Sequence, residues 1–281
     1  MANLARISSV ALLLTALSAP ARSQNAAGSA PQWVVDESGY YCALATKVAG
    51  PPDATLVLRT LPGTWTYDLM PVGDRWPAKV TGARKQIAFA LLPGTAADSR
   101  PPEQAFLDRD RMIALHGLAG KLIDDFPHST ALELRADGKP VVRYALPSNA
   151  AEASQALARC IASKLIEAGA DPADFEPGGR VPNPIGDQNK WLDVPPVMSM
   201  GDGEGVHAAV MLDLDPGGKP TDCVILELSG RLDRQRVCQN LLQRARYEPA
   251  RDAKGKALRS IAVYDLDELV RVTVTVETFA G

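Results

Sequence analysis

The chain has 281 residues, a formal net charge of −3 at pH 7 and an aromatic content of 5%. This length suits about two domains of ordinary size. Lys and Arg are scattered along the sequence without a basic stripe that could neutralise phosphates, so no nucleic-acid partner is expected.

The first residues carry the pattern of a secretory signal peptide. A basic residue, Arg6, precedes an apolar run over residues 10–17, and small residues follow up to Ser23. We therefore expect residues 1–23 to be removed and the mature protein to reside in the periplasm. A retained membrane anchor is the alternative, but the run is far shorter than the roughly 20 residues of a spanning helix. No other segment approaches that length, so no stable membrane span is expected after cleavage.

Residues 24–171 are predicted to form an N-terminal α+β domain dominated by antiparallel strands. Short apolar runs alternate with turn residues, and the Asp137-Gly138 pair predicts a hairpin turn. The spacing favours an antiparallel meander, while residues 112–126 fit neither the strand period nor the helix period. The predicted strands cover residues 33–35, 41–48, 55–60, 65–70, 85–91, 130–135 and 141–146.

A helix is predicted to complete this domain. Asn149 and Glu152 have the spacing of a capping box, and Gly169 ends the helix. Further features of the region are Trp33-Val34-Val35-Asp36, Cys42, Cys160 and Gly169-Ala170-Asp171-Pro172. With these features it resembles the uncharacterised N-terminal domain of exported proteobacterial proteins, some of them likened to invasion-associated locus B proteins. An unrelated small α+β domain held by one disulfide is the alternative.

Residues 172–196 are predicted to be a linker. The segment is rich in Pro and Gly and has little apolar periodicity, which is typical of a semi-rigid connection. Trp191 and Leu192 are its apolar exceptions, and we expect them to dock onto a domain.

Residues 197–281 are predicted to form a small antiparallel sheet with one packed helix. Even-numbered residues from Val206 to Leu214 form the buried face of the first strand, which leaves His207 pointing outward without a partner. The next strand, around Cys223, is apolar on both faces. It is therefore either central in the sheet or in contact with the first domain or a partner. Asp233 is the expected N-cap of the helix that follows.

Short motifs run through this last region in a characteristic order. They are Asp215-Pro216-Gly217-Gly218-Lys219, Asp222-Cys223, Ser229-Gly230, Leu232-Asp233, Arg246-Tyr247-Glu248-Pro249-Ala250-Arg251-Asp252 and Gly255-Lys256. In this order they resemble the C-terminal domain of TonB-family energy transducers. Leu228, where a second Ser is common, and residues 262–269, which look like an insertion, depart from the family pattern.

The resemblance implies that an extended partner segment adds as a strand to the exposed sheet edge near the C-terminus. The expected partner is a protein or an extended peptide in the cell envelope. Valines alternate with polar residues along the last predicted strand, as in an amphipathic strand. The expected partner-binding edge is Val270, Arg271, Val272, Thr273, Val274, Thr275 and Val276.

Four cysteines in an exported chain predict two disulfides, for which three connectivities exist. Cys42 and Cys160 fall in the N-terminal domain, whereas Cys223 and Cys238 fall in the C-terminal domain. Each pair joins a strand to the helix expected to cover it, so the pairing Cys42–Cys160 and Cys223–Cys238 is favoured. A metal or redox thiol pair is the alternative, but the sequence lacks Cys-x-x-Cys and a histidine at ligand spacing. No cofactor or metal is therefore expected.

The sequence lacks the short motifs of common enzymes. Gly-x-Ser-x-Gly, Ser-x-x-Lys, His-Glu-x-x-His and a P-loop are all missing. We predict a periplasmic, non-enzymatic protein whose TonB-like module recognises a protein or peptide, with a link to envelope transport. A membrane-anchored energy transducer component with an uncleaved signal is the first alternative. A secreted enzyme of unknown reaction is the second, because catalytic groups assemble across distant sequence.

Overall fold

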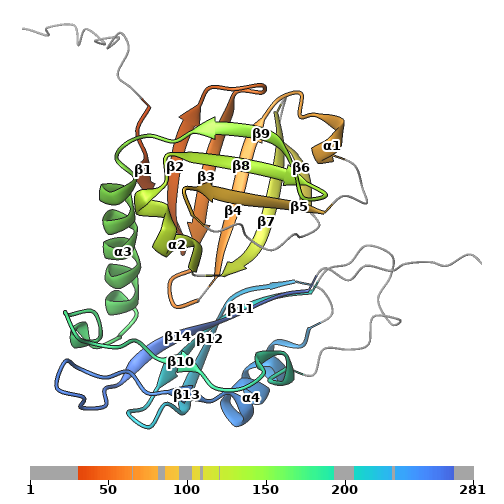
Figure 1. The fold of residues 1–281 in the computed structure, drawn as a ribbon. Helices are drawn as coiled ribbons and strands as arrows, with labels where there is room; N and C mark the ends of the chain where they lie inside the picture. Colours follow the sequence, from red (N-terminus) through yellow and green to blue (C-terminus); the bar gives the residue numbers. More distant parts are fainter. Residues whose placement is uncertain are drawn as a thin grey trace, which may run out of the picture. The chain divides into compact units, whose positions relative to one another are not determined.

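A computed structural model describes residues 31–64, 66–81, 86–94, 103–107, 110–119, 121–192, 206–229 and 232–268. The chain from Pro31 onward forms one compact unit. Its architecture is α+β with antiparallel sheets, as the sequence predicts (Figure 1). We call residues 31–167 the N-terminal lobe and residues 206–268 the C-terminal module.

Two antiparallel sheets build the N-terminal lobe. The larger has the order β1 (Val34–Asp36), β2 (Cys42–Val48), β3 (Ala54–Thr60), β4 (Thr66–Gly73), β7 (Asp110–Ala119) and β6 (Glu103–Leu107). The smaller has the order β5 (Ile87–Leu92), β8 (Ala131–Ala136) and β9 (Lys139–Ala145). The helical elements are α1 (Ala78–Thr81), α2 (Lys121–Asp125), the 3₁₀ turn η1 (Phe126–His128) and α3 (Ala150–Glu167).

The core of this lobe lies between its two sheets. Residues of β3 alternate between buried and partly exposed, so one face of the strand turns inward. Leu56 and Leu58 from the larger sheet join Phe89 and Leu134 from the smaller sheet in one apolar cluster. In Figure 1 the smaller sheet crosses one face of the larger sheet. The lobe is therefore a two-layered β structure, with α3 packed beside it.

The predicted meander holds only for β1 to β4. The next strand, β5, leaves the larger sheet and pairs with β8, so the prediction of a single meander is wrong. The ambiguous residues 112–126 contain most of β7, then α2 and the first residue of η1. The pairing of β4 with β7 shifts register between Tyr67 and Leu69, and Gly117 in β7 has a φ of 63°. This irregularity explains why the segment does not show a strict period of two.

The predicted capping box at the start of α3 is wrong. Asn149 occupies the N-cap position, but its side chain makes no capping hydrogen bond to the helix. Instead its amide oxygen accepts from the backbone N–H of Trp33 at 3.0 Å, and its amide nitrogen donates to the carbonyl of Trp33 at 3.2 Å. Asn149 thus ties the start of the helix to the segment that enters β1.

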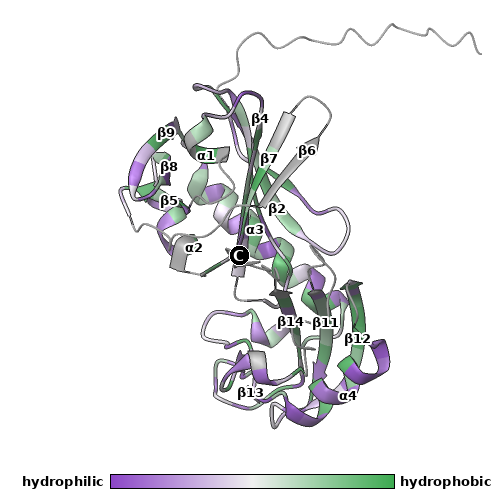
Figure 2. Ribbon diagram, turned by 90° about the vertical axis from the view of Figure 1, so that its right-hand side faces the viewer, coloured by the Kyte–Doolittle hydropathy of each residue, from purple (hydrophilic) through white to green (hydrophobic). Residues whose placement is uncertain are grey.

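A three-stranded sheet and one helix form most of the C-terminal module. β11 (Val206–Leu214) lies between β12 (Pro220–Ser229) and β14 (Ser260–Glu268), and α4 (Arg234–Arg244) packs on one face. Figure 2 shows that the three strands are predominantly apolar. The carboxylate of Asp233 accepts from the backbone N–H of Arg236 at 2.7 Å, which confirms the predicted N-cap.

Residues 262–268, the described part of the segment that looks like an insertion, belong to β14. Ala262, Tyr264 and Leu266 are buried members of β14, which pairs with β11 along its whole length. Apolar side chains at alternate positions give this segment a core face. The strand predicted at residues 270–276 lies outside the described residues.

The segment between the lobe and the module is folded against the module. It contains the 3₁₀ turns η2 (Pro172–Asp174) and η3 (Gln188–Lys190) and the short strand β10 (Asn183–Pro184), which pairs with β13 (Tyr247–Glu248). Trp191 and Leu192 are buried in the core of the module, which confirms that they dock onto a domain. The Trp191 ring lies 5.4 Å from that of Tyr247. This segment is therefore more than a spacer.

Candidate functional site at the three-stranded sheet

The hairpin between β11 and β12 is fixed by one aspartate. The carboxylate of Asp215 accepts from the backbone N–H groups of Gly217 at 2.8 Å and Lys219 at 3.0 Å. Gly218 has a φ of 78°, and a Cβ at this position would collide with the carbonyl of Tyr247. The predicted hairpin turn is therefore present, and it sets the register of the two strands.

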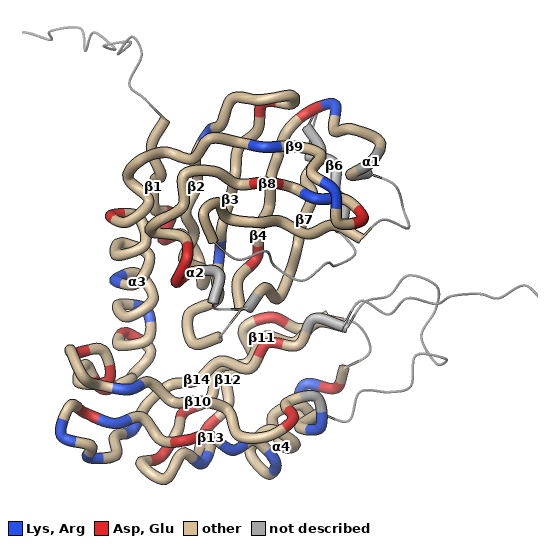
Figure 3. The backbone as a smooth tube through the Cα atoms, viewed as in Figure 1, with Lys and Arg blue, Asp and Glu red and all other residues tan. Residues whose placement is uncertain are grey.

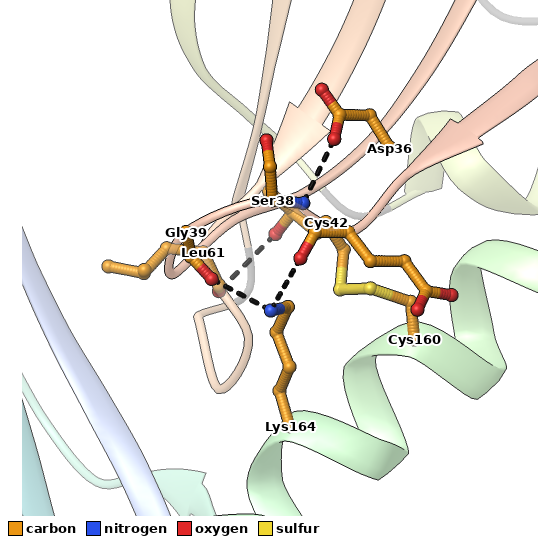
Figure 4. The surroundings of a disulfide bond; sticks show 9 residues. Asp36, Ser38, Gly39, Cys42, Leu61, Cys160 and Lys164 are labelled. Atoms are coloured by element: carbon orange, nitrogen blue, oxygen red, sulfur yellow. Dashed lines mark hydrogen bonds between the residues drawn. A yellow bond between two sulfur atoms is a disulfide. The ribbon is translucent and has the colours of Figure 1, made fainter.

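The two disulfides have the pairing that the sequence favours. Cys223–Cys238 joins β12 to α4, while Cys42–Cys160 joins β2 to α3. Figure 4 shows the second bond together with Lys164, whose ammonium donates to the carbonyls of Glu37 at 2.9 Å and Gly39 at 2.7 Å. Each disulfide holds a helix against its sheet. Two such bonds are typical of proteins that mature in an oxidising compartment.

The three-stranded sheet presents two edges within the described residues, because β11 is its central strand. On the β12 side, the side chain of Val224 is exposed. On the β14 side, the backbone N–H of Val263 donates to the carbonyl of Gly63, with an N···O distance of 3.3 Å. Gly63 belongs to the turn between β3 and β4. The β14 edge therefore makes a backbone hydrogen bond to a group outside its own sheet.

The face of the sheet opposite α4 packs against the N-terminal lobe. Leu61 from the β3–β4 turn forms an apolar cluster with Ala209 and Val263, with Tyr41, Met211 and Leu226 at its margin. Ala209 is fully buried, so the prediction that only the even-numbered residues of this strand face a core is incomplete. Leu226, on the second apolar face of β12, packs against this cluster, so this face of the strand contacts the N-terminal lobe. Of the two alternatives for that strand, contact with the first domain is the one observed.

A polar network borders this apolar contact. His207 Nε2 lies 3.2 Å from a carboxylate oxygen of Glu227, and its Nδ1 lies 3.9 Å from one of Asp265. The Tyr41 hydroxyl of the N-terminal lobe donates to the other oxygen of Glu227 at 3.4 Å. The prediction that His207 has no partner is therefore wrong. Its partners Glu227 and Asp265 lie on neighbouring strands but far away in the sequence, so a local sequence pattern cannot predict these contacts.

The network continues inside the N-terminal lobe. The Arg59 guanidinium lies 4.5 Å above the ring of Tyr41, and its Nε lies 3.0 Å from a carboxylate oxygen of Asp68. His116 Nδ1 lies 3.2 Å from the other oxygen of Asp68. The whole network thus contains two histidines, three carboxylates, a tyrosine and an arginine, and it extends from the lobe into the module through the contact of Tyr41 with Glu227.

The environment of the network shifts two of its pKa values. Burial raises the pKa of the Tyr41 phenol to about 12, with the neighbouring carboxylates adding to the effect, so the hydroxyl remains a hydrogen-bond donor. Burial opposes ionisation of Asp68, but His116 and Arg59 outweigh it and hold the pKa of that carboxyl below its usual value. The protonated Tyr41 phenol favours its hydrogen bond to Glu227 of the module, and the ionised Asp68 carboxylate favours its contacts with Arg59 and His116 within the lobe.

Asp174 forms a second polar contact at the start of β14. Its carboxylate accepts a short hydrogen bond from the Ser260 hydroxyl, while its other oxygen has no hydrogen-bond partner. The residue is only 2% exposed, and burial raises the pKa of the carboxyl to about 6. Beside it, Ile261 packs with Leu165 and Ala170. No sequence motif singles out Asp174, because its burial follows from the docking of the segment before the module.

Among the described residues, no group of three His, Cys, Asp or Glu side chains could hold a metal ion. Positive and negative residues are interspersed around β10, β13 and α4 (Figure 3). Within the part of the chain that the structure describes, no helix is long and apolar enough to cross a membrane. The predicted partner-binding residues 270–276 follow β14 but lie outside this part.

Comparison of the chain with protein-family models, with curated proteins and with solved structures finds no match in any of the three.

Proposed function

We propose that this is a periplasmic, non-enzymatic protein whose C-terminal module binds a protein or an extended peptide by strand addition. The binding edge comprises β14 and the residues that follow it, 270–276. The partner belongs to the cell envelope, and the interaction serves envelope transport. The observation that carries the proposal is the hydrogen bond from Val263 to a carbonyl outside the sheet, because this is the type of bond that an added strand makes.

Two further features support strand addition. Within the described residues β14 has a sheet neighbour only on its β11 side, so its opposite edge is not paired with another strand of the sheet. The module is also held rigid by the Cys223–Cys238 disulfide and by the Asp215 turn. A rigid edge loses little conformational entropy when a strand binds, which favours affinity.

The resemblance to the C-terminal domain of TonB-family transducers gives the proposal its recognition mode. The motif order that carries the resemblance corresponds to strand, hairpin, strand, helix and strand, and the described module has these elements in that order. The sequence of the N-terminal lobe resembles the N-terminal domain of other exported proteins. We propose that the lobe regulates or presents the module.

The substitution Thr273→Pro tests the proposal in the full-length chain. Proline removes one backbone donor from the edge, so capture of the envelope partner should fall three- to tenfold, equivalent to about 0.5–1.5 kcal/mol. The matched variant Thr273→Ser retains the donor and should capture the partner as the wild type does. Capture is measured by quantitative mass spectrometry after pull-down from periplasmic extract. Equal capture by both variants, with unchanged circular dichroism, would exclude recognition through this edge.

A further inference from the structure

The turn between β3 and β4 contacts the sheet edge at which the proposed partner would bind. Gly63 in this turn accepts the hydrogen bond from Val263, near the middle of β14. In strand addition, the carbonyl groups of an incoming segment accept hydrogen bonds from the edge in the same manner. The turn thus uses a backbone donor that an external strand would need.

The fit between the turn and the edge depends on the absence of a side chain at residue 63. A Cβ built on Gly63 would lie 3.0 Å from the backbone nitrogen of Val263, 3.0 Å from its Cγ2 and 3.3 Å from Leu165 Cδ2. Gly63 also has a φ of 94°, a conformation that other residues rarely adopt. Any larger residue would push the turn away from β14.

The turn has its own internal hydrogen bonds. The Thr64 backbone N–H and hydroxyl both donate to the Leu61 carbonyl, at 3.0 and 2.8 Å. The Thr60 hydroxyl donates to the Thr66 carbonyl at 2.9 Å. Because these bonds hold the turn in shape, it loses little conformational entropy when it lies against the edge.

Contacts on either side of the turn hold the lobe over β14. Leu61 packs with Val263 and Ala209 next to the hydrogen bond. Towards one end of the strand, Ile261 packs with Leu165, and the Ser260 hydroxyl bonds to Asp174. Towards the other end, Asp265 faces His207, whose partner Glu227 accepts from Tyr41. Groups from outside the module therefore contact β14 from Ser260 to Val263, and Tyr41 of the lobe reaches the adjoining polar network through Glu227.

We infer that turn 61–64 is an internal competitor for the β14 edge, which holds the edge closed until the N-terminal lobe moves away. This inference rests on the proposed function, because it names the regulation of the same binding edge. A partner strand must displace the turn to pair with Val263, so loosening the turn increases the affinity for an extended peptide.

The substitution Gly63→Ala in the full-length chain tests the inference. The matched control is Gly138→Ala, since Gly138 also has a positive φ, of 77°, but a Cβ there would meet no atom within 4 Å. Both variants strain a turn, whereas only the first disturbs β14. Leu61→Ala is a second test variant, which weakens the apolar contact without backbone strain and serves if Gly63→Ala does not fold.

Two quantities are measured for each protein. The first is the exchange rate of the Val263 amide hydrogen by NMR, which should rise about tenfold in Gly63→Ala and in Leu61→Ala but not in the control. The second is the dissociation constant for a synthetic peptide of alternating valine and threonine flanked by lysines, which should fall about tenfold in the same two variants.

The outcomes separate this inference from the proposed function. Unchanged exchange at Val263 in both test variants would overturn the inference. Faster exchange with equal peptide affinity in all proteins would also overturn it but would leave strand addition standing. Faster exchange without peptide binding by any protein would contradict both the inference and the proposed function.

Discussion

Polar residues whose partners are distant in sequence explain most of the differences between the sequence predictions and the structure at the residue scale. The N-cap role of Asp233 is predictable because a helix cap depends on residues three positions apart. By contrast, Asn149 forms hydrogen bonds with Trp33, which is distant in sequence. His207 on β11 contacts the carboxylate of Glu227 on the neighbouring strand β12. Local patterns cannot reveal such partners, because the fold alone brings them together.

Asp174 provides a prediction about the pH dependence of stability. Its pKa is raised from 3.8 to about 6 in the folded protein, so the folded state binds more protons than the unfolded state between these values. Ionisation of this carboxyl should therefore lower the free energy of unfolding by about 2–3 kcal/mol as the pH rises through this range. We expect Asp174→Asn to abolish that loss and to be more stable than the wild type above pH of about 6.

Urea unfolding of both proteins at a series of pH values from about 4 to 8 measures this difference. Glu176→Gln is the control, because it removes one negative charge from an exposed position of the same segment. A constant difference between Asp174→Asn and the wild type over the whole series would refute the assignment. The control should follow the wild-type curve.

At the scale of elements, strands with clear alternation were predictable and irregular ones were not. The hairpin at Asp137 and Gly138 joins β8 to β9 with positive φ at both residues, as its dipeptide predicts. β7 carries an irregularity at Gly117, and β6 follows no recognised pattern. The assignment of β5 to a second sheet could not be predicted, because strand spacing does not reveal which sheet a strand joins.

The disulfides yield a prediction at this scale. Cys223 and Cys238 are 15 residues apart, whereas Cys42 and Cys160 are 118 residues apart. In the chain-entropy model, replacing the first pair by Ala should cost about 3 kcal/mol of unfolding free energy, and replacing the second pair nearer 5 kcal/mol. Denaturant unfolding of the two double variants measures these costs.

Peptide mapping under non-reducing conditions provides the control for this prediction. The wild-type protein should yield only the two crosslinked peptides that the structure contains. A crosslink between Cys42 and either cysteine of the C-terminal module would contradict the assigned pairing. An equal cost for the two double variants would show that loop length does not govern the stabilisation.

At the scale of the whole molecule, the three-stranded sheet of the module also forms the contact with the lobe. One face of that sheet packs on α4, while the other packs on Leu61 and its neighbours. The sequence predicted an apolar second face on β12 but left open whether it meets the first domain or a partner. The structure assigns it to the first domain. The sequence could not show that the same contact reaches the edge of β14, because the hydrogen bond involves only backbone atoms.

Site-specific photo-crosslinking in living cells tests strand addition most directly. A photoreactive amino acid is placed at Thr273, within the proposed binding edge, and in a second protein at Arg143, an exposed residue of β9. Mass spectrometry then identifies the crosslinked segment of the partner. We predict that Thr273 crosslinks to one short segment of an envelope protein and that Arg143 does not. Equal crosslinking from both positions, or none from Thr273 while the partner is still captured, would contradict recognition through this edge.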